Sequence, residues 1–359
     1  MISKIDCYDL RLPLHVPYGN SLGVLTEFTS IIAVITDENG KYGMGEGTPA
    51  QPGYQHETPE SIWKFVCEQS KKIIGDSAEN AYNEILKKKD VFPFGSTIFL
   101  TALEEMQGVN VLEIPREEIS FPLVGIVNPP KGMTLEDHLE QRIEEGYKTL
   151  KIKIGFDLEK DLKKVKKIQN IVGDRALLRL DANQAYTYEE AYRFTNGIDP
   201  FNIELLEQPF PTGVWEPMQR LSVDSPLPLM LDESIFNKQD VIQTGKLQCA
   251  QYIKFKLMKS ASAVAMTEEM KIANEYGIKV LIGNGVASDI GCLQETLIGY
   301  HANCRAAGEQ NGYLKPIVSL FDNPIGFNNG NLIIPERYCP MLDEEVLKKY
   351  SRAELHIEK

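Results

Sequence analysis

The sequence predicts an α/β protein in which a closed barrel of seven or eight parallel strands follows an N-terminal α+β region. From Phe121 onward, apolar strand-like runs alternate with amphipathic helical patterns, which is typical of a parallel sheet. Three of these apolar runs end in an acidic residue: Asp181, then Glu207 after 26 residues, then Asp232 after another 25. One strand, one helix and two short loops fill such an interval, so each acidic residue falls at the C-terminal end of a parallel strand.

Residues 1–120 form the predicted α+β region. Strand-like alternation covers residues 2–14 and 28–37, and a third strand over 41–46 follows the turn sequence Asp-Glu-Asn-Gly. Helical patterns follow at 58–74, 78–88 and 96–107. Two Gly/Pro-rich segments, 15–23 and 45–56, interrupt these elements and are expected to be loops, which at such length are often functional.

The barrel is predicted from residues 121–323, and residues 324–359 are expected to return to the N-terminal region. Its expected strands are 121–127, 149–154, 176–181, 203–207, 228–232, 251–256, 279–283 and 317–321. Amphipathic helices between them include 135–145, 158–172, 188–196 and 261–276. Thr187, with Glu190 three residues later, forms a capping-box signature for one helix start. Seven or eight such units favour a closed barrel over an open sheet.

Composition describes an ordinary globular protein with no affinity for polyanions. The length of 359 residues suggests one large domain with an accessory one, or two domains, and 43% hydrophobic with 25% charged residues is typical of a soluble globular protein. A net charge of −13 argues against nucleic-acid and anionic-membrane partners. The six cysteines lack metal-ligand spacing and no apolar run reaches ~18 residues, so we expect reduced thiols and a cytoplasmic location.

The three strand-end carboxylates predict a metal site. In a barrel, the C-terminal strand ends converge on one mouth, where active sites lie. Asp181, Glu207 and Asp232 would therefore face one another there, and three carboxylates repel strongly unless a cation lies between them. Hard oxygen ligands that leave positions open for water or substrate suit Mg²⁺.

Lysine pairs are expected to flank this site. Lys151 and Lys153 point to the same side of their strand because side chains alternate, and Lys254 and Lys256 repeat the arrangement four strands later. This arrangement suits removal of a proton next to a carboxylate, because the cation stabilises the enediolate and a neutral lysine accepts the proton. The pKa of such a lysine must fall from about 10.4 to about 7–8, and a neighbouring ammonium or divalent cation lowers it.

Five segments together resemble the enolase superfamily, specifically its muconate-lactonizing-enzyme (mandelate racemase/muconate lactonizing enzyme) subgroup. They are Lys-Ile-Lys-Ile-Gly at 151–155, Leu-Asp-Ala-Asn at 180–183, Glu-Gln-Pro at 207–209, Leu-Asp-Glu-Ser at 231–234 and Ile-Lys-Phe-Lys at 253–256. The resemblance spans nearly the whole chain. It implies a modified TIM barrel, (β/α)7β, with an N-terminal α+β capping domain completed by the C-terminal tail, and a homo-oligomer between dimer and octamer.

The resemblance also implies residue roles. Asp181, Glu207 and Asp232 are similar to the Mg²⁺ ligands, Lys153 and Lys256 to an acid/base pair, and Lys151 to its electrostatic neighbour. Asn183 and Glu233 match positions that orient the ligands.

The substrate-specifying positions match the subgroup less well. Members often carry a glutamate after the seventh strand, where this chain has Ala287, and dipeptide epimerases carry Asp-x-Asp after the last strand, where this chain keeps only Asp322. A helix N-cap explains Ser288 or Asp289 as well as a substrate contact does. The candidate substrate contacts are Tyr18, Asn20, Tyr54, Asn284, Ser288, Asp289 and Asp322.

The leading hypothesis is therefore Mg²⁺-dependent removal of the α-proton of a small carboxylate substrate. A lysine on each face favours racemisation or epimerisation of an amino-acid-like acid, whereas muconate-type cycloisomerisation and syn-dehydration use the same intermediate and remain open. A Schiff-base barrel with Lys256 as nucleophile would not need three carboxylates. A non-catalytic binding barrel is expected to have lost a metal ligand or a lysine. This chain keeps all six of these residues, which are Asp181, Glu207, Asp232, Lys151, Lys153 and Lys256.

Overall fold

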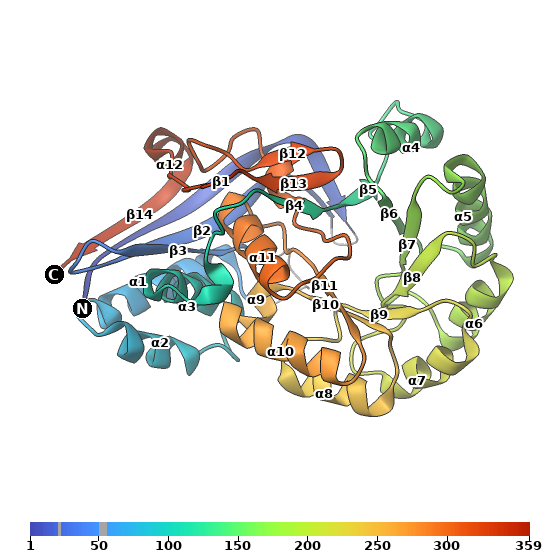
Figure 1. Cartoon of the computed structure of the whole chain (residues 1–359), viewed down its shortest axis with the longest axis horizontal. Coiled ribbons are helices and arrows are strands. Elements are labelled where there is room, and N and C mark those ends of the chain that lie inside the picture. Colours follow the sequence, from blue (N-terminus) through green and yellow to red (C-terminus); the bar gives the residue numbers. More distant parts are fainter. Residues whose placement is uncertain (21–22, 50–55) are drawn as a thin grey trace.

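The computed structural model describes residues 1–20, 23–49 and 56–359. Figure 1 shows two parts: a long antiparallel sheet with the first three helices beside it, and a curved row of strands wrapped on the outside by helices. Both chain termini lie at the far end of the long sheet, away from the barrel.

The long sheet has the order β14-β1-β2-β3, with every neighbouring pair antiparallel. Its strands are β1 (Ile2–Asn20), β2 (Gly23–Asp37), β3 (Tyr42–Gly47) and β14 (Ser351–Glu358). The C-terminal strand therefore does return to the N-terminal region, while domain boundaries at 120 and 323 stay a prediction. The predicted loop over 15–23 is wrong: β1 continues to Asn20 after a register irregularity between Pro13 and Tyr18, so the described part of this segment is a hairpin.

Helices α1 (Pro59–Ile73), α2 (Ala78–Leu86) and α3 (Pro93–Gln107) follow the sheet, and α12 (Glu344–Tyr350) precedes β14. Thr58 begins α1 through the reciprocal bonds of a capping box with Ser61. Helix α3 lies directly against β3, where Gly43, Gly45 and Gly47 present no side chain to the helix backbone.

The barrel strands form one parallel sheet in the order β5 to β11. They are β5 (Val124–Val127), β6 (Thr149–Lys153), β7 (Leu177–Asp181), β8 (Ile203–Glu207), β9 (Leu229–Leu231), β10 (Tyr252–Phe255) and β11 (Lys279–Ile282). The helices are α4 (Leu135–Glu144), α5 (Leu158–Val172), α6 (Tyr188–Gly197), α7 (Trp215–Asp224), α8 (Lys238–Leu247), α9 (Leu257–Ser260), α10 (Ala263–Glu275) and α11 (Asp289–His301). The predicted Thr187–Glu190 capping box begins α6.

The barrel closes at a place that the sequence did not indicate. The predicted last strand, 317–321, is wrong: it is not a regular strand, and Phe321 makes only an isolated bridge to Leu342. Residues 308–309 take that place instead, because Val124 N–H donates to Gly308 O at 2.8 Å and Glu309 N–H donates to Ile282 O at 2.9 Å. The closing segment therefore joins β5 to the residues at the end of β11.

Two short pieces complete the chain. A three-stranded antiparallel sheet contains β4 (Ile119–Pro122), β12 (Gly326–Asn328) and β13 (Asn331–Ile334), and the 3₁₀ turns are Asn110–Leu112 and Gly312–Leu314. Within the described ranges, no helix is long and apolar enough to cross a membrane.

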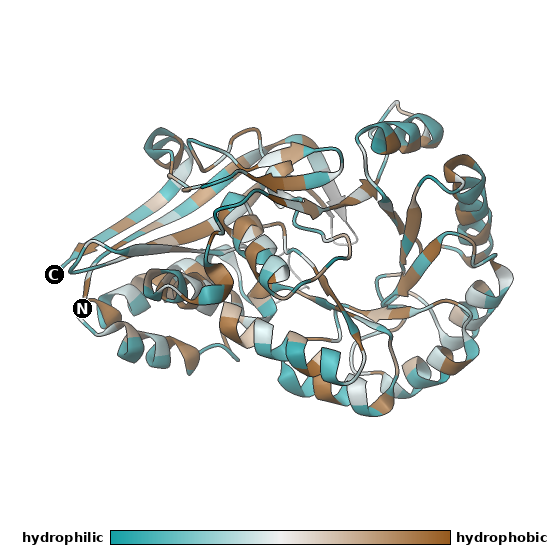
Figure 2. Ribbon diagram, viewed as in Figure 1, coloured by the Kyte–Doolittle hydropathy of each residue, from teal (hydrophilic) through white to brown (hydrophobic). Residues whose placement is uncertain are grey.

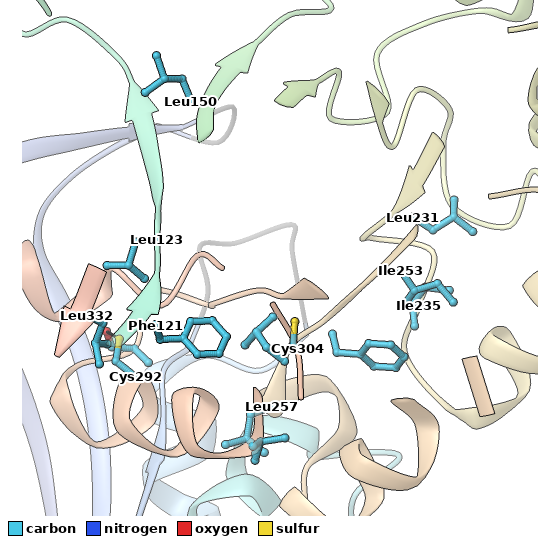
Figure 3. Packing of buried hydrophobic residues seen from close by; sticks show 14 of the residues in the cluster. Phe121, Leu123, Leu150, Leu231, Ile235, Ile253, Leu257, Cys292, Cys304 and Leu332 are labelled. Atoms are coloured by element: carbon cyan, nitrogen blue, oxygen red, sulfur yellow. Dashed lines mark hydrogen bonds between the residues drawn. The ribbon is translucent and has the colours of Figure 1, made fainter. Parts of the chain in front are cut away.

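Alternation along the barrel strands sets up the site. Leu150 and Ile152 of β6 and Leu178 and Leu180 of β7 are fully buried in the main apolar cluster, part of which is drawn in Figure 3. Because side chains alternate, Lys151 and Lys153 of β6 and Arg179 and Asp181 of β7 face the other side, toward the barrel axis. Figure 2, in which the ribbon is coloured by hydropathy, shows both hydrophilic and hydrophobic residues on the outer helices, as expected of amphipathic helices.

Candidate active site

The predicted acidic residues end consecutive parallel strands. The register pairs Lys153 of β6 with Asp181 of β7, and Asp181 with Glu207 of β8. Asp232 directly follows β9. All three carboxylates are buried, with Asp181 and Glu207 fully removed from solvent. The strand ends therefore bring together the three acidic residues that the spacing predicted.

Lys151 links two of these carboxylates. Its Nζ lies 3.0 Å from Asp181 Oδ2 and donates to Glu207 Oε1 at 3.1 Å. The same ammonium donates to Glu309 Oε1 at 2.8 Å, and only 6% of the lysine side chain is exposed. Lys151 is thus a buried positive charge held among acidic side chains, and its electrostatic role stays a prediction.

Lys254 makes a similar bridge from β10. Its fully buried Nζ donates to Glu207 Oε1, to Asp232 Oδ2 at 3.2 Å, and lies 2.8 Å from Glu309 Oε1. Glu309 stands on the closing segment and pairs with both buried lysines. It is the main site residue that the sequence reasoning missed.

The two proposed acid/base lysines lie on opposite parts of the mouth and contact different carboxylates. Lys153 donates to Asp181 Oδ2 at 2.8 Å and also to Asn183 Oδ1. Lys256, which follows β10, donates to Asp232 Oδ2 at 2.8 Å. Their exposure differs, because 38% of the Lys153 side chain reaches solvent and only 8% of the Lys256 side chain does.

Other residues hold these groups in place. Asn183 Nδ2 donates to Glu233 Oε1 at 3.0 Å, so Asn183 connects Lys153 to the residue beside Asp232. Lys259 of α9 donates to both Asp232 O at 2.7 Å and Asp232 Oδ1 at 3.0 Å. The sequence did not single out Lys259.

Burial and charge act in opposite directions on these groups. Burial raises the pKa of Asp181, but the nearby ammonium groups, Lys151 first, lower it more, so the net shift is downward. Burial and then the charge of Asp181 raise the pKa of Glu207 to about 7, against the lowering effect of Lys151 and Lys254. Burial lowers the pKa of Lys151, but Asp181, Glu207 and Glu309 more than reverse this and raise it well above its usual value.

The donor set fits a hard divalent cation in chemistry and order. Asp181, Glu207 and Asp232 supply carboxylate oxygens from adjacent strand ends, which is the ligand type that Mg²⁺ prefers. Glu233 Oε2 is buried and makes no hydrogen bond in the described part of the chain, whereas Glu207 Oε2 lies 3.0 Å from Lys151 Nζ. Among the described residues, no three Asp, Glu, His or Cys side chains lie close enough together to hold a metal ion. Lys151 and Lys254 lie between the carboxylates.

The capping region is fastened to the loop after β11. Glu46 of β3 is buried and accepts hydrogen bonds from Ser288 N at 3.0 Å and Gly291 N at 2.8 Å, at the start of α11. Thr48 Oγ1 donates to Gly285 O at 2.9 Å. These contacts hold residues 285–291 against the end of β3. The predicted loop over 45–56 is wrong at its start, because β3 continues to Gly47.

The predicted substrate contacts that the structure describes lie in β1, in the segment 284–289 and at Asp322. Asn284 and Asp289 are engaged by the protein: Asn284 contacts Glu295 and Ala287, and Asp289 accepts from Leu320 N and Ser319 Oγ, each at 2.8 Å. Ser288 is buried at the Glu46 contact and Asp322 is exposed beside Met341. Tyr18 and Asn20 pair through the backbone with Leu25 and Gly23, and Tyr54 lies outside the described residues. Their roles in substrate binding stay predictions.

This architecture defines a class of protein. A capped parallel barrel with three carboxylates at neighbouring strand ends and lysines on both flanks is the arrangement expected of the enolase superfamily. A family model described as "Enolase C-terminal domain-like" matches residues 134–338, which is more than half of the chain. The chain belongs to this family, which confirms the resemblance and the predicted fold class.

Similar proteins catalyse epimerisation and racemisation. The L-Ala-D/L-Glu epimerase of Clostridium acetobutylicum is 25% identical over 357 residues, covering 93% of this chain and 96% of that protein. The N-succinyl-L-Arg/Lys racemase of Bacillus cereus is 25% identical over 331 residues, covering 88% of each. A crystal structure of the dipeptide epimerase from Cytophaga hutchinsonii, complexed with Mg and D-Ala-L-Val, superposes with a TM-score of 0.88 at 20% identity and covers all of both chains. This last likeness concerns the fold.

Proposed function

We propose that this chain is an isomerase that racemises or epimerises an amino-acid-like carboxylate by Mg²⁺-dependent removal and return of the α-proton. The observation that carries the proposal is the placement of two lysines, Lys153 at the end of β6 and Lys256 just after β10, on different carboxylates of one buried acidic cluster. The relatives named above, which are an epimerase and a racemase, support the same class of reaction.

Asp181, Glu207 and Asp232 would hold the cation. When bound, Mg²⁺ supplies positive charge that stabilises the negative charge developing on the substrate carboxylate. Asn183 orients Lys153, because it accepts from the lysine and donates to Glu233. Lys259 orients Asp232 through both its carboxylate and its main-chain oxygen.

The two lysines perform the proton transfers. One lysine, as the neutral amine, accepts the α-proton; the C–H bond breaks and its electron pair remains on the α-carbon, delocalised into the carboxylate. The other lysine, as the ammonium, donates a proton to the opposite face of that carbon, which inverts its configuration. Because each lysine ends the cycle in the other's protonation state, proton exchange with solvent restores the starting form.

The test is proton NMR in D₂O with Mg²⁺, using both enantiomers of a panel of N-acyl amino acids and both α-epimers of dipeptides. We expect loss of an α-proton signal for at least one substrate class, stopped by EDTA. Lys153→Ala and Lys256→Ala should each abolish α-proton exchange for one configuration of the substrate. Lys160→Ala, which removes an exposed lysine of α5, should leave α-proton exchange intact for both configurations. If no substrate exchanged its α-proton and calorimetry detected no Mg²⁺ binding, the proposed function would be rejected.

The same experiment separates the remaining outcomes. Product analysis of the exchanged substrate distinguishes an inverted centre from a lactone or a dehydrated product, which cycloisomerisation or syn-dehydration would give. We further propose a cytoplasmic homo-oligomer, from dimer to octamer, which acts on a soluble small molecule. Light scattering coupled to size-exclusion chromatography measures that assembly.

A further inference from the structure

One buried acid beside the mouth has no part in the reaction described above. Glu295 of α11 is only 3% exposed. Its Oε2 accepts from Asn284 Nδ2 at 2.6 Å, and its Oε1 accepts from the Leu257 backbone N–H at 3.4 Å. Leu257 directly follows Lys256, and Asn284 directly follows Gly283. A single carboxylate therefore connects the segment after β10 to the segment after β11.

The stem of Lys256 lies between these two segments. A Cβ built on Gly283 would lie 2.8 Å from Lys256 Cγ and 2.7 Å from Lys254 Cδ, so both lysine stems pass directly over this glycine. The Gly283 N–H also donates to Phe255 O at 2.6 Å, which ties the two strand ends together just before Lys256. The aliphatic part of the Lys256 side chain therefore packs against Gly283, and the backbone that follows Lys256 is held at Leu257 by Glu295.

The Asn284 side chain links Glu295 to the loop after β11. Its Oδ1 accepts from Ala287 N at 3.0 Å, while its Nδ2 donates to Glu295 and approaches Cys292 Sγ at 3.5 Å. Both ends of the amide are used, so the Asn284 side chain transmits the position of Glu295 to the loop 283–287. That loop is a wall of the Lys256 site.

The pKa of Glu295 also depends on the nearby charge of Lys256. Burial raises the pKa of Glu295 to about 8, opposed by the hydrogen bonds from Asn284 and Leu257 and by the positive charge of Lys256. No hydrogen bond or ion pair among the described residues joins Glu295 to Lys153, whose partners are Asp181 and Asn183 on the other flank. The influence of Glu295 is therefore directed to one of the two lysines.

We propose that Glu295 is a positioning residue for Lys256, so that it controls proton transfer on one face of the substrate and not on the other. The inference rests on the proposed function. It adds that the two half-reactions have separate structural supports: Glu295 and Asn284 for Lys256, and Asn183 with Glu233 for Lys153.

The experiment compares α-proton exchange for the two enantiomers of one substrate in D₂O. Lys153→Ala and Lys256→Ala first assign each enantiomer to its lysine. Glu295→Gln keeps the side-chain shape but faces Asn284 Nδ2 with an amide that cannot accept at both positions. We expect the Lys256-dependent exchange rate to fall about 10- to 100-fold, as small misplacements of reacting groups do, while the Lys153-dependent rate stays within about twofold.

Glu105→Gln is the matched control. Glu105 is a partly buried glutamate of α3, and it accepts from Met44 N at 3.0 Å and from Nε2 of Gln294, the residue next to Glu295, at 3.2 Å. We expect both exchange rates of this variant to match the wild type. If Glu295→Gln does not fold, Asn284→Ala serves in its place, with the same one-sided fall in the Lys256-dependent α-proton exchange rate.

The outcomes are distinct. Equal loss of both exchange rates in Glu295→Gln would mean a general structural role and would overturn the inference, as would unchanged rates. If the wild-type protein exchanged neither enantiomer of any substrate, the proposed function itself would fail, whatever the variant does.

Discussion

A methyl group added at Gly45 tests how the capping region is fastened. Gly45 lies in β3 where α3 crosses the strand. A Cβ at this position would lie 1.9 Å from Ile98 O and 2.7 Å from Thr101 Oγ1, whereas real Cβ contacts are essentially never below 3.0 Å. Since Ile98 O belongs to the helix backbone, no side-chain rotation can relieve the contact. Gly45→Ala therefore forces β3 and α3 apart by about 1 Å.

The energetic cost follows from this displacement. Overpacking of a close-packed core costs about 1–3 kcal/mol, and a contact between two backbones belongs at the upper end of that range. The loss of chain freedom in the unfolded state when glycine becomes alanine offsets about 0.4–1 kcal/mol. We expect the free energy of unfolding to fall by about 2–3 kcal/mol.

Urea-induced unfolding, followed by tryptophan fluorescence and far-UV circular dichroism, measures this change. Trp63 lies on α1 and Trp215 on α7, so each part of the molecule carries one fluorescent reporter. Gly197→Ala is the control, because its Cβ would meet only Leu162 methyl carbons at 3.5 and 3.7 Å. A Gly45→Ala protein within 0.5 kcal/mol of the wild type, or no less stable than Gly197→Ala, would refute the reasoning.

Three further changes have defined outcomes. Burial raises the pKa of Glu105 to about 7 from 4.5, so the free energy of unfolding falls by up to about 3 kcal/mol as the pH rises through that window. Glu105→Gln should remove this fall. If urea unfolding gave the same difference in free energy between Glu105→Gln and the wild type at pH 5 and at pH 8, the prediction would be contradicted. Glu309→Gln leaves Lys151 and Lys254 with one fewer carboxylate and should lower the free energy of unfolding by about 3 kcal/mol, whereas a change below 1 kcal/mol would show that the other acids compensate fully. Glu233→Gln should weaken Mg²⁺ binding about 10- to 100-fold by calorimetry, and unchanged affinity would remove Glu233 from the ligand support.

The parts of the site that were predictable from sequence are those fixed by local periodicity. Asp181 and Glu207 each end an apolar run, and side-chain alternation alone determines that Lys151 and Lys153 share a side. Regular strand–helix alternation then brings such ends to one edge without any knowledge of long-range contacts. The helix starts were predictable for the same reason, because a cap such as Thr187 acts within its own turn.

The closing segment was not predictable because its residues carry no strand pattern. Ala306-Ala-Gly-Glu-Gln-Asn311 lacks apolar alternation, so the more apolar stretch at 317–321 was favoured. The observed segment is held by a few backbone hydrogen bonds, from Val124 on one side and to Ile282 on the other, and by the pairing of Glu309 with buried lysines. Its place depends on residues far away in the chain, such as Val124 and Lys151, which lie more than 150 positions from it.

Buried carboxylates that bind backbone N–H groups were missed for a related reason. No local pattern in the sequence marks Glu46, Glu104 or Glu295 as buried. In the structure, Glu46 accepts from Ser288 and Gly291, and Glu104 of α3 accepts from Ala263 N at 2.8 Å at the start of α10. A carboxylate at a helix N-terminus satisfies free N–H groups and meets the positive end of the helix dipole. The partner helices lie far away in sequence, so no local pattern reveals these contacts.

Together these carboxylates make the loop after β11 a shared element of both parts of the molecule. Glu46 holds its C-terminal end to the capping sheet, and Glu295 holds its N-terminal end to the segment after β10. The stem of Lys256 packs on Gly283 within the same loop, so the position of this lysine depends on how the capping region is seated. Lys153 has no such connection among the described residues, because its hydrogen bonds lead to Asp181 and Asn183 within the barrel. Displacing β3, as Gly45→Ala does, should therefore disturb the Lys256 side of the mouth before the Lys153 side.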